Sequence, residues 1–135
     1  MCKSFKSIQD SLFRNYYEKY YCEDLEKLVV SFIPKESKHT DAFSIISNCI
    51  FYDFLLVEKF GLSVVECYSC IAHEVGHFVS PPREVESDQN EREFHADQYV
   101  VGLGLADHLI SALKKMCPDD ELTMMRIEKM SSINS

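Results

Sequence analysis

Glycine and proline are scarce in this sequence, with four residues of each among 135. So low a content excludes a collagen-like or linker-rich chain. Basic residues are also in the minority, because 14 Lys and Arg face 22 Asp and Glu, which gives a net charge of −8. That charge repels phosphate backbones and no basic patch offsets it, so we expect no nucleic-acid partner.

Long apolar runs are also missing. A transmembrane helix requires about 18 consecutive apolar residues, and the longest candidate, residues 44–57, is shorter and contains Asn48 and Asp53. The first six residues lack the apolar stretch of a secretory signal. We therefore expect a cytoplasmic protein without a membrane span. Its six cysteines are too few for a disulfide scaffold, which predicts reduced thiols that pack mainly in the core.

The apolar and charged fractions, 46% and 27%, are typical of a soluble globular domain. In the first half, helical spacing predicts a helix over residues 4–21. Residues 25–33 favour a strand, residues 42–54 favour one or two strands, and 54–60 a short helical turn that Gly61 closes.

The second half is predicted to be helical. Ser63 and Glu66 form a capping-box pattern before an apolar run, so a helix should cover 64–79. Pro81 and Pro82 end it, and 83–89 form a polar linker. Further helices are expected over residues 90–101, 105–116 and 119–130. The order of elements predicts an α+β fold.

The pattern HExxH at residues 73–77 carries the chemistry. Residues four apart lie on one face of a helix, so His73 and His77 can bind one metal ion. Glu74 lies beside that ion, where it can hold and deprotonate a bound water. Gly76 leaves the helix surface open to the backbone of a neighbour. The alternative is two histidines on a solvated helix face.

A catalytic zinc ion needs a third protein ligand and an open position for water. Glu93 lies in the next predicted helix and can complete the set. Asp97, four residues later on the same face, can accept the free ring N–H of a ligating histidine. Ala96 is small enough for the two helices to pack closely. Glu91 is a rival third ligand, but it lacks the Ala-Asp continuation.

The two patterns together, HExGH at 73–77 and ExxAD at 93–97, resemble the gluzincin zinc metallopeptidases. The similarity is to the group that contains the CAAX-prenyl endopeptidases and the HtpX-type membrane proteases, and it covers roughly residues 40–116. Ala42-Phe43 resembles an Asn-Ala-Phe stretch of that group, with Asp41 in place of the Asn. The chain lacks the membrane helices of these proteases and has a short spacer. Without membrane helices and with a short spacer, the chain resembles the soluble catalytic cores called minigluzincins.

The resemblance implies a zincin-like domain in which a short mixed or antiparallel sheet of about three strands packs on an active-site helix, a glutamate helix and further C-terminal helices. It implies one Zn²⁺ per chain, with His73, His77 and Glu93 as ligands. Glu74 would be the general base and proton shuttle, and Asp97 would support a ligand. Residues 1–135 would form a single metallopeptidase-like domain, and helices in the terminal segments 1–24 and 117–135 would be able to cover its cleft.

The expected function is therefore the hydrolysis of peptide bonds in a peptide or protein substrate, as an endopeptidase. One alternative is a regulatory protease of the HExGH type that cleaves a repressor. Another is a latent or non-catalytic zinc-binding interaction module. The group that stabilises the oxyanion is open, because Arg92, Tyr99 and His108 are all candidates and each can be structural.

Cys67 and Cys70 have the CxxC spacing of metal ligands. They lie on the helix of His73, however, and no second pair follows at a suitable distance. The pattern therefore favours packing in the core.

Overall fold

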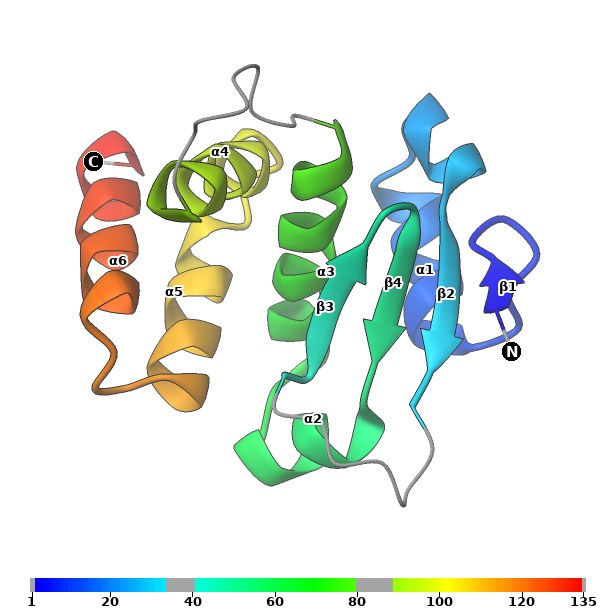
Figure 1. Ribbon diagram of the computed structural model, residues 1–135, viewed down its shortest axis with the longest axis horizontal. Coiled ribbons are helices and arrows are strands. Elements are labelled where there is room, and N and C mark those ends of the chain that lie inside the picture. Colours follow the sequence, from blue (N-terminus) through cyan, green and yellow to red (C-terminus); the bar gives the residue numbers. More distant parts are fainter. Residues whose placement is uncertain (1, 34–40, 80–88, 135) are drawn as a thin grey trace. The chain divides into compact units, whose positions relative to one another are not determined.

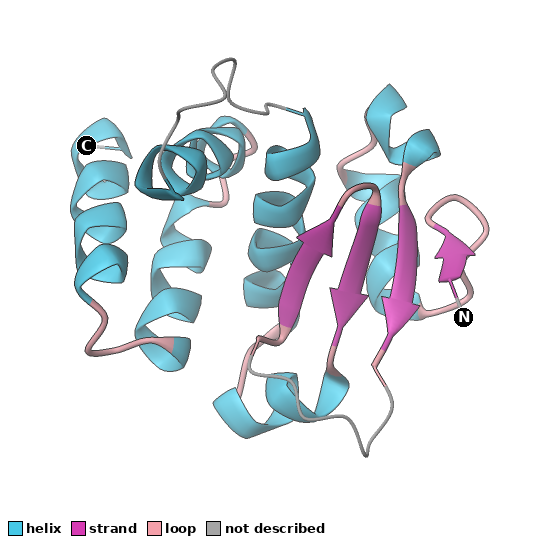
Figure 2. Ribbon diagram, in the orientation of Figure 1, coloured by secondary structure: helices cyan, strands magenta, loops and turns pink. Residues whose placement is uncertain are grey.

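The structure is a computed structural model that describes residues 2–33, 41–79 and 89–134. In these residues six α-helices and a four-stranded mixed sheet form an α+β fold, which confirms the predicted fold class. The chain divides into two units, Met1–Val64 and Val65–Ser135. We call them the sheet unit and the helical unit, because all four strands belong to the first and the longest helices to the second (Figure 2).

The sheet of the sheet unit has the strand order β1-β2-β4-β3 (Figure 1). β1 (Cys2–Ser4) is antiparallel to β2 (Val29–Phe32), and β3 (Phe43–Ile46) is antiparallel to β4 (Cys49–Tyr52). The central pair, β2 and β4, is parallel. The expectation of about three strands was one too few, because β1 forms by pairing with residues 25 to 29 positions further along the chain. Residues 42–54 contain two strands, which is one of the two numbers predicted for this segment.

The helix predicted over residues 4–21 is shorter in the structure, where α1 spans Ser11–Lys19. Asp10 sets its start, because the Asp10 carboxylate accepts hydrogen bonds from the backbone N–H groups of Leu12 and Phe13. An aspartate in this position caps a helix rather than extending it. The prediction was therefore wrong for residues 4–10. A 3₁₀ helix, η1 (Glu23–Lys27), precedes β2.

Aromatic rings form the core of the sheet unit. Phe13 of α1 is fully buried, and its ring centroid lies 5.2 to 6.4 Å from those of Phe32, Phe43 and Tyr52 on the sheet. Ring pairs at such distances contribute beyond the apolar area that they bury. The unit ends in α2 (Phe54–Phe60), which Asp53 caps and Gly61 closes at a φ of 67°, so the predicted short helix is confirmed.

The helical unit follows the predicted boundaries closely. Its helices are α3 (Val64–Val79), α4 (Gln89–Gly102), α5 (Ala106–Met116) and α6 (Glu121–Asn134). Pro81, Pro82 and nearly all of the predicted linker lie outside the described residues. Among the described residues, no helix is both long and apolar enough to cross a membrane.

Polar contacts join the helices of this unit to one another. Glu66 of α3 is buried, and its carboxylate accepts hydrogen bonds from Ser111 and, at 2.7 Å, from Lys115 of α5. Cys67 and Cys70 are buried free thiols on α3. Burial raises the pKa of the Cys67 thiol to about 11, which keeps it protonated at neutral pH. Both cysteines are therefore core residues, as expected.

Candidate metal centre

α3 presents the two histidines of the HExxH pattern one helical turn apart. Their rings stand nearly perpendicular, at 85°, and their Nε2 atoms lie 3.1 Å apart. The His73 side chain is 10% exposed and that of His77 is 20% exposed. The histidines therefore do not lie on a solvated helix face, yet solvent still reaches them on the side of His77.

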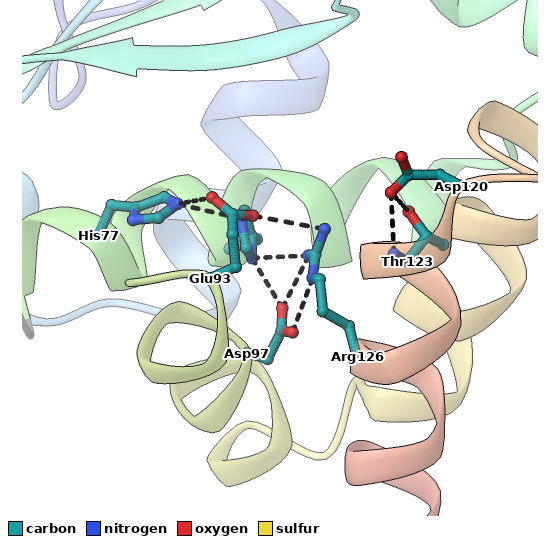
Figure 3. A network of polar contacts seen from close by, with 7 residues as sticks. His77, Glu93, Asp97, Asp120, Thr123 and Arg126 are labelled. Atoms are coloured by element: carbon teal, nitrogen blue, oxygen red, sulfur yellow. Dashed lines mark hydrogen bonds and ion pairs between the residues drawn. The ribbon is translucent and has the colours of Figure 1, made fainter. Parts of the chain in front are cut away.

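α4 brings Glu93 against both rings. Its Oε2 lies 3.1 Å from the Nε2 of His73, and its Oε1 lies 3.1 Å from the Nε2 of His77 (Figure 3). The ligand atoms of the three residues all lie within 4.8 Å of one another, so this group could hold a metal ion. Glu91, the rival third ligand, is exposed on α4 and does not belong to the group.

The donor set fits zinc in both type and spacing. Two imidazole nitrogens and one carboxylate are a common catalytic zinc set, and atoms about 2.1 Å from a tetrahedral ion lie about 3.4 Å apart. The three contacts of the cluster, each 3.1 Å, come close to that value. Three protein ligands would leave the fourth position of the ion for a water molecule.

Asp97 lies behind His73, as its position four residues after Glu93 predicts. Its Oδ1 is 2.9 Å from the Nδ1 of His73. A proton on Nδ1 that is donated to this carboxylate leaves Nε2 free to face a metal ion. Burial lowers the pKa of His73, but the hydrogen bonds to Asp97 and Glu93 outweigh burial and raise it to about 9.

The two acidic groups stay ionised in this setting. Burial raises the pKa of Glu93 and of Asp97, but their hydrogen-bond partners outweigh it. For Glu93 these partners are His73 and His77, and for Asp97 they are Arg126 and His73. Both pKa values therefore fall below their usual range.

Glu74 is buried beside the cluster, with 6% of its surface exposed. Burial raises the pKa of its carboxyl to about 6, against the opposing effect of the two histidines. Such a carboxyl can both accept and release a proton near neutral pH, which is what a general base with a later role as acid requires.

The close approach of α3 and α4 depends on Gly76. A Cβ atom at this position would lie 2.8 Å from the backbone oxygen of Ala96 and 3.0 Å from the Cβ of Tyr99. Ala96 is itself fully buried. The sequence-based interpretation of both small residues is therefore confirmed, and their contact brings Glu93 within reach of the histidines.

Sequence reasoning missed Arg126, which α6 places in the same network. The guanidinium group is buried and forms two hydrogen bonds of 2.9 Å with Asp97. Its Nη1 also lies 3.3 Å from the Oε2 of Glu93 (Figure 3). One signal was available, since Thr123, Arg126 and Met130 fall on one helical stripe. All three are buried, and an arginine in a buried stripe needs a partner.

The suggested oxyanion residues lie in different surroundings. Arg92 and His108 are exposed, on α4 and α5 respectively. Tyr99 lies where its Cβ abuts Gly76, so its backbone position contributes to the contact between α3 and α4. The role of these residues in catalysis stays a prediction.

Comparisons with family models, curated proteins and solved structures give no significant match to this chain.

Proposed function

We propose that this protein is a zinc-dependent endopeptidase of the gluzincin type, with a zincin-like fold. One observation carries the proposal: the metal-binding atoms of His73, His77 and Glu93 converge, with a buried glutamate, Glu74, beside them. A purely structural zinc site has no need of that glutamate, whereas hydrolysis of a peptide bond needs a base there.

The chemistry divides between the ion and the chain. When bound, zinc lowers the pKa of water and polarises the carbonyl that is to be attacked. Glu74 then accepts a proton from the attacking water and delivers it to the leaving amine. In the metal-free structure, burial raises the pKa of this carboxyl to about 6, above its ordinary value.

Contacts with residues outside the ligand set keep the ligands oriented for this chemistry. Asp97 accepts the Nδ1–H of His73 and thereby directs the Nε2 of that ring toward the ion. Glu93 comes from a second helix, so the ligand set is complete only when α3 and α4 are packed together. We propose a peptide or protein as the substrate and the cytoplasm as the compartment.

Metal analysis and a cleavage assay on the Glu74→Gln variant test the proposal. We expect one zinc ion per chain in the wild type and in the variant. With casein or a mixed peptide library as substrate, cleavage by the variant should fall by about 100- to 10,000-fold, because only the base is lost. Glu128→Gln removes an exposed glutamate from α6 and serves as the matched control, with zinc and activity unchanged.

The outcomes separate the alternatives. Zinc in both proteins with cleavage by the wild type alone supports the peptidase. Zinc without cleavage by either contradicts it and favours a latent or non-catalytic zinc-binding module. Absence of zinc and of any other divalent metal would show that the HExxH pattern has been misinterpreted.

A further inference from the structure

We propose that Arg126 is a positioning residue of the metal centre, which holds the third ligand and the carboxylate behind His73 in their binding orientation. The inference rests on the proposed metal site, but not on the reaction carried out there. It assigns to the C-terminal helix α6 an indirect part in metal binding, through Glu93 and Asp97 of α4.

The geometry of the guanidinium group is the first argument. Nε donates to the Oδ2 of Asp97 and Nη2 to its Oδ1, both at 2.9 Å, which is a bidentate pair. The remaining nitrogen, Nη1, lies 3.3 Å from the Oε2 of Glu93. One rigid planar group therefore fixes two carboxylates of α4 relative to each other (Figure 3).

Charge is the second argument. Glu93 and Asp97 lie four residues apart on one face of α4, where two negative charges repel each other. Asp97 is almost fully buried, with 2% of its surface exposed, and a buried charge without a partner is costly. Arg126 supplies the positive charge between the two carboxylates, so they can stay side by side before a metal ion arrives.

The effect of Arg126 reaches His73 through Asp97. Nη2 of Arg126 and Nδ1 of His73 both contact the Oδ1 of Asp97, each at 2.9 Å. When the Nδ1–H of His73 donates to that oxygen, the two donors share one acceptor. A change in the Asp97 rotamer would therefore turn the His73 ring and move its Nε2.

Other contacts hold α6 independently of Arg126. Within the helix, Asp120 caps the first turn, because its carboxylate accepts hydrogen bonds from the backbone N–H and the hydroxyl of Thr123, at 2.9 and 3.0 Å. Lys129 places its Nζ 4.3 Å from the centre of the Phe94 ring on α4. Loss of Arg126 should consequently change the metal centre more than it changes the docking of the helix.

Arg126→Gln and Lys129→Gln form a matched pair for the test. Each removes one positive charge that bridges α6 to α4, but only the first removes contacts to the metal-binding group. We would measure zinc dissociation constants by competition with a chromophoric chelator. The expected increase is about 10- to 100-fold for Arg126→Gln, the usual size of such outer contacts, and less than about threefold for Lys129→Gln.

Two further measurements separate positioning from general stability. The visible absorption spectrum of the Co²⁺-loaded protein reports ligand geometry, so it should change in Arg126→Gln and stay as in the wild type in Lys129→Gln. Arg126→Lys should recover part of the affinity, because a single ammonium nitrogen cannot serve both carboxylates. This conservative variant also decides the question if Arg126→Gln does not fold, since it keeps the buried charge.

The proposal is overturned if Arg126→Gln, or Arg126→Lys in its place, binds zinc as tightly as the wild type with an unchanged Co²⁺ spectrum. It is also overturned if Lys129→Gln weakens zinc as much as Arg126→Gln does. A wild type that binds zinc but cleaves nothing defeats the proposed peptidase alone, because affinities and spectra still decide the role of Arg126. A wild type that binds no metal defeats both.

Discussion

The two units of this protein bury very different side chains. In the sheet unit, the largest buried groups are aromatic and aliphatic, with Phe5, Phe13 and Tyr16 fully enclosed. Apart from its buried tyrosines, Asp53 is the one buried polar or charged residue among the described residues of this unit, and Asp53 caps α2. The described part of the helical unit buries seven polar or charged residues: Glu66, Ser69, His73, Glu74, Asp97, Thr123 and Arg126.

The difference teaches where stability and chemistry reside. Apolar burial stabilises a fold without requiring special geometry, at about 25 cal/mol per Å². Buried charges instead require accurately placed partners and often contribute little net stability. We therefore interpret the sheet unit as the part optimised for folding. The helical unit keeps a set of buried charges, which under the proposed function serve metal binding and reaction.

The largest expected effect tests whether the apolar core of the sheet unit supplies stability. Phe13→Ala removes a fully buried ring that contacts three rings of the sheet. The free energy of unfolding, measured with urea, should fall by about 3–5 kcal/mol. Phe54→Ala is the control, because that ring is 54% exposed, and it should change stability by less than about 0.5 kcal/mol.

The same variant also tests whether the metal centre is independent of the aromatic core. Among the described residues, the hydrogen-bond and ion-pair partners of the candidate ligands belong to the helical unit. Zinc affinity of Phe13→Ala, measured while the protein is folded, should therefore stay within about threefold of the wild type. A large loss of zinc affinity would show that the metal centre depends on the aromatic core of the sheet unit.

The next effect concerns the contact between α3 and α4. A glycine in a helix interior usually gains about 1 kcal/mol when replaced by alanine. In Gly76→Ala the new Cβ would lie 2.8 Å from the backbone oxygen of Ala96, which only a helix movement can relieve. We expect a net loss of about 1–3 kcal/mol in the free energy of unfolding and weaker zinc binding, because Glu93 moves with α4.

Gly102→Ala provides the control for this variant. Gly102 ends α4, and nothing lies within 4 Å of a Cβ atom built there. The substitution should leave zinc affinity unchanged and stability equal or slightly higher. If Gly76→Ala were as stable as Gly102→Ala and bound zinc equally well, close helix packing would not be what positions Glu93.

The ligand cluster could be predicted from the sequence because its geometry is local. Helical periodicity places His73 and His77 on one face of α3. The same rule places Glu93 and Asp97 on one face of α4. The small residues Gly76 and Ala96 indicate that these faces meet, and the structure contains that contact. The site thus combines two local patterns and one packing contact.

The missed features depend on contacts between distant residues. Phe5 and Ile8 are buried, but they lie before α1 rather than in the helix predicted over residues 4–21. β1 requires Ser31 and its neighbours as partners, which no local pattern near Cys2 reveals. Arg126 lies 29 residues from Asp97, and only the packing of α6 on α4 brings them together.

The last expected effect is a pH dependence that the helical unit alone should show. In the metal-free protein, hydrogen bonds to Asp97 and Glu93 outweigh burial and raise the pKa of His73 to about 9, above its ordinary value of 6.5. The protonated ring therefore stabilises the metal-free fold fully below pH 6.5, and this contribution is lost as the pH rises through 9. Zinc must displace the same proton, so zinc affinity should rise over this window, by up to about tenfold per pH unit.

Calorimetric titration of zinc at pH 7.5, in two buffers of different protonation enthalpy, measures this exchange. We expect about one proton to be released from His73 for each zinc ion bound. Asp97→Asn removes a charge that holds that proton, so the number of protons released should fall. Equal proton release by the wild type and Asp97→Asn would contradict the assignment. Release near zero by both would mean that His73 is already neutral in the metal-free protein. Equal release of about one proton by both would mean that the Asp97 charge is not what holds the proton on His73.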